Sequence, residues 1–182
     1  APSSVWDSVS ATTSDPSNFN DTSDNVSTPA RMAAYMWNDD GQGYNGDIYL
    51  GYHTNATGNG ARGSIGLITN ATTIVNQPRW ATLVSDVLDA MCLIEDDNWE
   101  HTWFNRASPT YTSSYGEIGA ALGGRMCGTI IEVAFHDDPI DAQLLRDPKV
   151  RYVAARSQVH AAIRYFNEFD SNPVRSEERR VG

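Results

Sequence analysis

One eight-residue run restricts the folds open to this chain more than any other feature. Residues 128–135 read Gly-Thr-Ile-Ile-Glu-Val-Ala-Phe, an apolar, β-branched pattern that is typical of a strand covered on both faces. Glu132 interrupts the pattern, and a lone ionised carboxylate there costs several kcal/mol unless it is paired, protonated or close to a metal. We therefore expect a buried central strand and treat Glu132 as a candidate functional residue, with an arginine ion pair as the structural alternative.

A second run, residues 47–53, also predicts a strand, and it ends on His53. In open α/β sheets, sites gather at the carboxyl ends of strands, so His53 and Glu132 together suggest a metal-dependent hydrolase. A purely structural role for His53 is the alternative. Asn55 and Arg62 follow in a polar loop that would form the rim of such a site. His136 lies just beyond the central strand, where it either lines the site or caps the next turn.

The remaining periodicity predicts an α/β fold with a mainly parallel open sheet and helices on both faces. The expected elements are a helix over 29–38, a strand over 64–69, an amphipathic helix over 80–91, a long connection over 95–124, a short helix from 139 and a helix over 148–169. The apolar face of the last helix would carry Tyr152, Val159 and Phe166. We expect residues 1–28 to be a polar loop or linker, 29–169 one domain, and 170–182 a disordered tail whose last eight residues resemble translated adapter DNA.

Composition excludes several classes of function. The net charge of −10 disfavours contact with phosphate backbones, so we expect no nucleic-acid partner. No apolar stretch approaches the roughly 18 residues of a membrane span. The two cysteines, Cys92 and Cys127, form no C-x-x-C pair, which argues against a thiolate zinc site. They are either two buried thiols or a disulfide, and the sequence leaves both open.

Three segments in this order resemble a known family. Residues 48–56 resemble the "S-I-H-x-N-A" strand, residues 129–135 the "x-L-V-E-x-G-F" strand, and residues 138–145 the "N-P-x-[DE]-x-x-L-L" turn and helix of the zinc-dependent N-acetylmuramoyl-L-alanine amidases of the amidase-3 family. The resemblance covers about residues 27–169. It implies an amidase-3-like fold that cleaves the amide bond between N-acetylmuramic acid and L-alanine in peptidoglycan.

The resemblance also implies roles for individual residues. His53 falls on a zinc ligand of the family, and Glu132 on the catalytic glutamate that moves the proton of the attacking water. Asn55, Arg62 and His136 would contact the substrate. The implied cofactor is Zn²⁺, and the implied location is secreted, periplasmic or in the cell envelope. We expect a monomer with peptidoglycan as its partner.

The chain departs from the family at the other two zinc ligands. No histidine precedes His53 and no glutamate precedes Glu95, whereas the family places a histidine and a glutamate ligand upstream. This indicates an N-terminally truncated amidase that lacks its first strand and helix, has an incomplete zinc site and is inactive alone. The alternative is a non-catalytic peptidoglycan-binding relative that has lost the metal site. A zinc carboxypeptidase is disfavoured because the chain has no H-x-x-E ligand pair.

Overall fold

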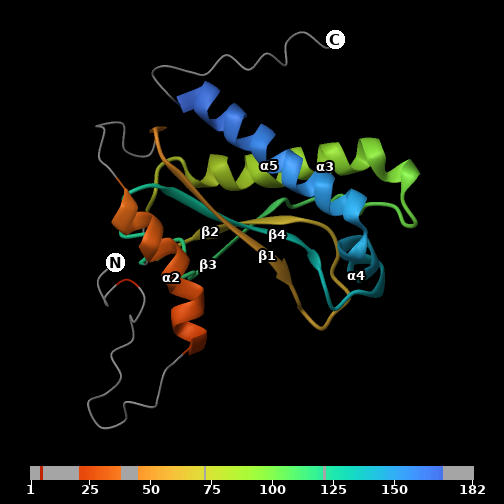
Figure 1. The fold of residues 1–182 in the computed structure, drawn as a ribbon, viewed down its shortest axis with the longest axis horizontal. Coiled ribbons are helices and arrows are strands. Elements are labelled where there is room, and N and C mark those ends of the chain that lie inside the picture. The colour runs from red at the N-terminus through yellow and green to blue at the C-terminus, as the bar shows by residue number, and fades with distance from the viewer. Residues whose placement is uncertain (1–4, 6–20, 38–44, 72, 121, 170–182) are drawn as a thin grey trace.

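A computed structural model describes residues 5, 21–37, 45–71, 73–120 and 122–169 (Figure 1). Within these ranges the chain forms a four-stranded sheet and several helices. The elements in order are α2 (Asp21–Met36), β1 (Ile48–Asn55), β2 (Ile65–Thr69), α3 (Gln77–Glu95), the 3₁₀ helix η2 (Asp96–Asn98), β3 (Thr110–Ser113), β4 (Cys127–Phe135), α4 (Pro139–Arg146) and α5 (Pro148–Phe169).

The sheet is open, with the strand order β1-β4-β2-β3. β1 pairs with β4 and β2 pairs with β3 in parallel, whereas β2 and β4 are antiparallel. The predicted α/β class and open sheet are confirmed, and the one antiparallel pairing makes the sheet mixed. β4 is buried at every position and has a strand on each side, which agrees with the position expected from its apolar run.

Helices cover both faces of the sheet. α3 and α5 run side by side along one face (Figure 1), where Ile131 and Val133 of β4 pack into their cluster. Ile130 of β4 points the other way and packs with Ala30 of α2 and Ile118. This alternation follows from the two-residue period of a strand. β4 therefore contributes to two hydrophobic clusters. Glu132 lies between residues of this strand that pack in those clusters.

The predicted start of the first helix is wrong, and one strand was not predicted. α2 begins at Asp21 rather than near Pro29, so residues 21–28 of the expected linker are helical and Pro29 lies inside the helix. Apart from Val26 these residues are polar, and without an apolar period they carry no helical signal. The strand β3 lies within the segment predicted to be one long connection. Its four residues are exposed or half-buried, so it has no apolar alternation, and only pairing with β2 defines it.

The buried face of α5 also differs from the prediction. Tyr152 is 67% exposed and Val159 is exposed as well, so the predicted apolar face is not the buried face of the helix, although Phe166 does pack against the core. The helix instead buries the stripe of Val150, Val153, Ala154, Ser157, Gln158, Ala161 and Tyr165. This stripe carries small side chains at its centre, which lets α5 approach α3 closely.

Two further expectations concern single features. Cys92 and Cys127 are both buried and free, so the structure contains two thiols rather than a disulfide. No helix in the described ranges is long and apolar enough to cross a membrane. The predicted tail over 170–182, and residues 1–4 and 6–20 of the predicted linker, lie outside the described residues.

Candidate active site

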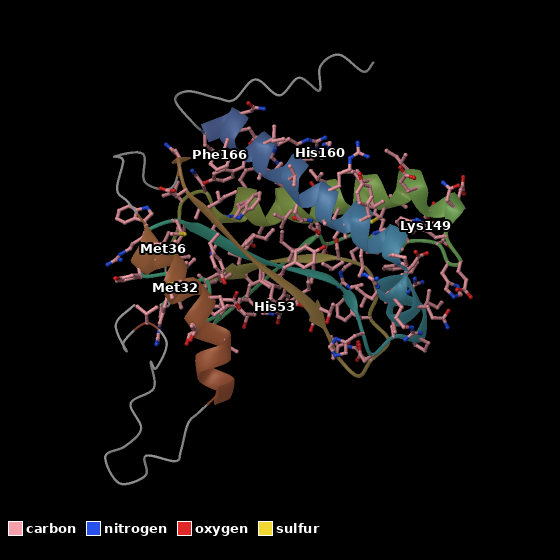
Figure 2. The ribbon with its side chains drawn as sticks, in the orientation of Figure 1. Met32, Met36, His53, Lys149, His160 and Phe166 are labelled. Carbon is pink, nitrogen blue, oxygen red and sulfur yellow. The ribbon has the colours of Figure 1, made fainter. Side chains whose placement is uncertain are left out.

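β1 and β4 bring the two principal candidates side by side. His53 is paired with Glu132 in the parallel register of these strands, close to the carboxyl end of each strand. On its other side Glu132 is paired with Ile65, the first residue of β2. Figure 2 shows His53 among the strands and His160 on α5, away from it. Two residues that are far apart in the sequence thus lie side by side near the carboxyl ends of β1 and β4, where a site was predicted.

Glu132 is a buried carboxylate without a full set of partners. The residue is 9% exposed, and its Oε2 atom is buried and has no hydrogen-bond partner in the described part of the chain. Burial raises the pKa of Glu132, while the nearby charge of His53 acts in the opposite direction. A carboxylate of raised basicity with a free oxygen atom is suited to accept a proton from a bound molecule.

His53 has a partner that was not predicted. Its Nε2 atom lies 3.1 Å from Oε2 of Glu117, whose side chain is 5% exposed. The other carboxylate oxygen of Glu117 accepts a hydrogen bond of 2.7 Å from the hydroxyl of Tyr49. The hydrogen bond to Glu117 raises the pKa of His53. The site is therefore a group of one imidazole and two carboxylates, from His53, Glu117 and Glu132.

The backbone of β1 makes room for Glu117. A Cβ atom on Gly51 would lie 2.5 Å from Oε1 of Glu117, so any larger residue at this position would push the carboxylate away. A signal for Glu117 is present in the sequence, because it is the lone charge in the stretch 116–124, which otherwise reads Gly, Ile, Ala and Leu. Like Glu132, Glu117 is a lone charge among small and apolar residues, but no strand pattern surrounds it.

The predicted rim residues His136 and Asn55 lie at the same strand ends. Nδ1 of His136 is 3.0 Å from the hydroxyl oxygen of Thr54, and the backbone N–H of His136 donates to the carbonyl of Asn55. The side chain of Asn55 accepts from the backbone N–H of Ala56 and so turns the chain into the next loop. Substrate contacts by these two residues stay predictions.

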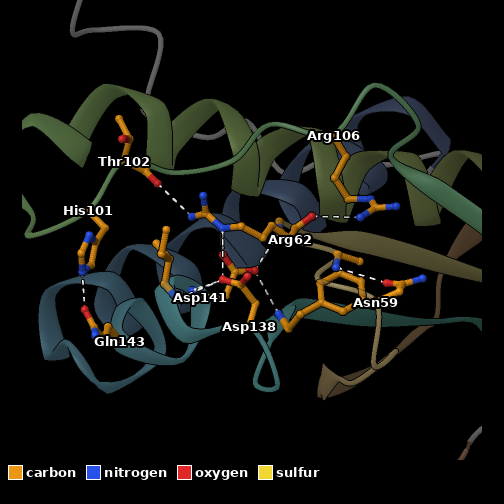
Figure 3. Close-up of polar contacts among 12 residues, drawn as sticks. Asn59, Arg62, His101, Thr102, Arg106, Asp138, Asp141 and Gln143 are labelled. Atoms are coloured by element: carbon orange, nitrogen blue, oxygen red, sulfur yellow. Dashed lines mark hydrogen bonds and ion pairs between the residues drawn. The ribbon is translucent and has the colours of Figure 1, made fainter.

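Arg62 is held by structural ion pairs (Figure 3). Its Nε atom donates to Oδ1 of Asp141 at 2.8 Å and lies 3.3 Å from Asp138. Asp141 is 1% exposed and also accepts from the backbone N–H groups of Gly63 and Phe135. The guanidinium thus fastens the loop before β2 to the start of α4. A role for Arg62 in substrate binding stays a prediction.

The donor set fits a zinc site in kind but not in number. Imidazole nitrogen and carboxylate oxygen are both normal zinc ligands, and His53 and Glu117 present one of each. Catalytic zinc is usually held by three protein ligands. In the ranges that the structure describes, no group of three or more His, Cys, Asp and Glu side chains could hold a metal ion.

Replacing Glu117 by Gln should lower the pKa of His53 in the metal-free protein. The hydrogen bond from the imidazolium to the Glu117 carboxylate raises this pKa, and a neutral amide supports the charge less well. A histidine with a raised pKa adds stability below its unfolded-state pKa and loses it as pH rises through the folded-state value. Glu117→Gln should therefore destabilise the protein more at pH 5.5 than at pH 8.

Titration of the His53 ring followed by NMR, with unfolding curves at both pH values, tests this expectation. Glu168→Gln is the matched control, because Glu168 is paired with Arg79 on the helical face. An unchanged His53 titration in Glu117→Gln would show that the contact does not form in solution.

Known structures resemble this fold. The sequence matches no family model and no curated protein. The N-acetylmuramyl-L-alanine amidase Ami1 of Mycobacterium abscessus matches with a TM-score of 0.54 at 19% identity, over 75% of this chain and 60% of that one. The CwlD amidase of Clostridioides difficile, solved in complex with the GerS lipoprotein, matches with a TM-score of 0.56 at 12% identity, over 81% and 64%. The chain has the fold of these amidases.

A third structure, Ami1 of Mycobacterium smegmatis, gives a TM-score of 0.53 at 14% identity, over 79% of this chain and 61% of that one. The chain thus covers less than two thirds of the length of each of these structures. At identities this low, the likeness establishes the amidase fold, and the chemistry has to be argued from the site.

Proposed function

We propose that the protein is a cell-wall hydrolase that cleaves the amide bond between N-acetylmuramic acid and L-alanine of peptidoglycan. The observation that carries this proposal is the buried Glu132, whose Oε2 atom has no partner in the described chain, paired in register with His53 in an amidase fold. Burying such a carboxylate without a partner lowers the stability of the fold. Its role in the proposed function is to transfer a proton to and from the bound reactant.

In this reaction a water molecule adds to the lactyl carbonyl carbon, and the bond from that carbon to the alanine nitrogen breaks. Glu132 accepts the proton of the attacking water and delivers it to the departing amine. Its raised pKa favours both transfers near neutral pH, because an ordinary carboxylate is too weak a base for the first step.

We propose zinc as the cofactor, with His53 as one ligand and Glu117 as a carboxylate beside it. Zinc in this position would lower the pKa of the water and polarise the carbonyl. Proton transfer remains the task of Glu132. Action on peptidoglycan would place the protein in the cell envelope, the periplasm or the extracellular medium, and we propose that it acts there as a monomer.

The test uses the protein expressed from its complete gene and a soluble muramyl peptide. We expect zinc-dependent release of new L-alanine amino termini, loss of this activity with a chelator, and loss of both activity and zinc binding in His53→Ala. His101→Ala is the control, since His101 contacts Gln143 on α4 and none of the three site residues. Absence of release at saturating zinc would overturn the proposal, and retained peptidoglycan binding would then identify a non-catalytic wall-binding protein.

A further inference from the structure

A groove of about 400 Å³ lies outside the group of His53, Glu117 and Glu132. It is lined by residues 60–62, Phe104 and residues 106–108, which come from the loops before β2 and β3. Four of the lining residues are Gly, Ala or Ser, so the groove has room for a ligand. Its two cationic residues, Arg62 and Arg106, lie next to each other (Figure 3).

The two arginines differ in what they are bound to. Arg62 makes ion pairs with Asp141 and Asp138 and donates to the carbonyl of Thr102, so its charge is matched. Arg106 donates from Nη1 to the carbonyl of Arg62 at 2.9 Å and, within the described chain, makes no ion pair. Its Nε atom is buried and has no hydrogen-bond partner there.

Arg106 is held in position without being neutralised. Its guanidinium lies 5.4 Å from the centre of the Phe135 ring, and a stacked planar guanidinium loses little freedom when it binds a carboxylate. Burial raises the pKa of Asp89 on α3 to about 6, and the positive charge of Arg106 acts in the opposite direction. One oxygen of Asp89 already accepts from the Ser64 hydroxyl and the Trp103 indole. In a chain of net charge −10, Arg106 is thus a cation that forms no ion pair within the described residues.

The groove adjoins the catalytic edge of the sheet. Ile65, which follows the loop of Arg62, is paired with Glu132. Phe135, which supports Arg106, lies three residues beyond Glu132 on β4, a distance of roughly 10 Å along a strand. An extended peptide advances about 3.3–3.6 Å per residue. A side-chain carboxylate on the second or third residue after the scissile amide can therefore span this distance.

We propose that this groove is a carboxylate-binding subsite, in which the fork of Arg106 binds an acidic residue of the substrate peptide beyond the scissile amide. The proposal rests on the proposed function for the identity of the substrate. It makes Arg106 a specificity-determining residue that selects acidic over amidated peptides. Arg62 shapes the subsite through its main-chain carbonyl, which anchors Arg106.

The test measures binding rather than turnover. The probes are N-acetylmuramoyl-L-alanyl-D-glutamate and its diamide, titrated calorimetrically into the protein with a chelator present so that hydrolysis does not contribute. We expect the wild-type protein to bind the dicarboxylate at least about tenfold more tightly than the diamide. Arg106→Gln should reduce this ratio to about one, since the amide keeps a donor for the Arg62 carbonyl but loses the charge and the fork.

Two further variants make the result specific. Arg106→Lys should give an intermediate ratio, because it keeps the charge and loses the paired donors. Arg156→Gln removes the same charge from the exposed face of α5 and should leave the ratio unchanged. Melting curves of each variant show whether it is folded.

Equal binding of the two probes by the wild-type protein, an unchanged ratio in Arg106→Gln, or no binding of either probe would each overturn the inference. Two other results distinguish a failure of the proposed function from a failure of this inference. A carboxylate preference in a protein that never releases L-alanine rejects the amidase and keeps the subsite. Hydrolysis without a preference rejects the subsite and keeps the amidase.

Discussion

In the proposed amidase reaction, replacing Glu132 by Gln should lower the rate by about 10³-fold without weakening the fold. Glutamine has nearly the same shape as glutamate but cannot accept and return a proton. Because burial raises the pKa of Glu132, ionisation of this carboxyl group costs the native state stability. A neutral side chain removes that cost, so the unfolding midpoint at pH 7 should stay the same or rise.

The measurement pairs the rate of L-alanine release with a thermal unfolding curve for the same preparation. Glu168→Gln makes the same chemical change at an exposed ion pair on α5 and should leave the rate unchanged. If Glu132→Gln keeps more than a tenth of the wild-type rate, another group moves the proton. A marked loss of stability would mean that Glu132 is a structural residue whose partner lies outside the described chain.

Replacing Gly66 by Ala should strongly destabilise the protein. Gly66 is the second residue of β2, and a Cβ atom there would lie 2.1 Å from the carbonyl oxygen of Ala81 in α3. The clash is with the backbone of the helix, which cannot relieve it by changing rotamer as a side chain can. α3 would have to move away from the sheet, and the loss of packing should cost about 3 kcal/mol or more.

For a chain of this size, such a cost lowers the unfolding midpoint by roughly 6–12 °C. Gly116→Ala is the matched control, because no atom lies within 4 Å of the position its Cβ would occupy. This control should be neutral or slightly stabilising, by less than about 1 kcal/mol, since alanine restricts the unfolded chain. A Gly66→Ala protein as stable as the control would show that α3 packs on β2 less closely than the structure has it.

Much of the fold could be read from local patterns. β1, β2, β4, α3 and α4 were all predicted, because each carries a clear apolar period or a proline-based start signal. β3 was not, because its residues Thr110–Ser113 are mostly exposed and only their pairing with β2 makes them a strand. The antiparallel direction of β2 relative to β4 could not be predicted either, because it depends on how the connecting segments cross the sheet.

The site could be predicted in part for the same reason. Glu132 and His53 stand out because one interrupts an apolar strand and the other ends a strand, and both signals are local. Glu117 contributes a carboxylate to the same site and was missed, because it lies in a connection without a period. The difference between Arg62 and Arg106 is likewise invisible in the sequence, where both are arginines in polar loops. Only the fold shows that Arg62 is paired with Asp141 and that Arg106 forms no ion pair in the described chain.

The sequence by itself determined that this is a layered α/β protein built around one apolar strand with a carboxylate in it. That conclusion needs only the cost of burying apolar and charged groups, which is set by residue type. Tertiary structure decided which imidazole and carboxylates meet, which stripe of α5 is buried, and which arginine keeps free donors. These outcomes depend on contacts between residues far apart in the chain, and such contacts are set by how the whole sheet and its helices pack.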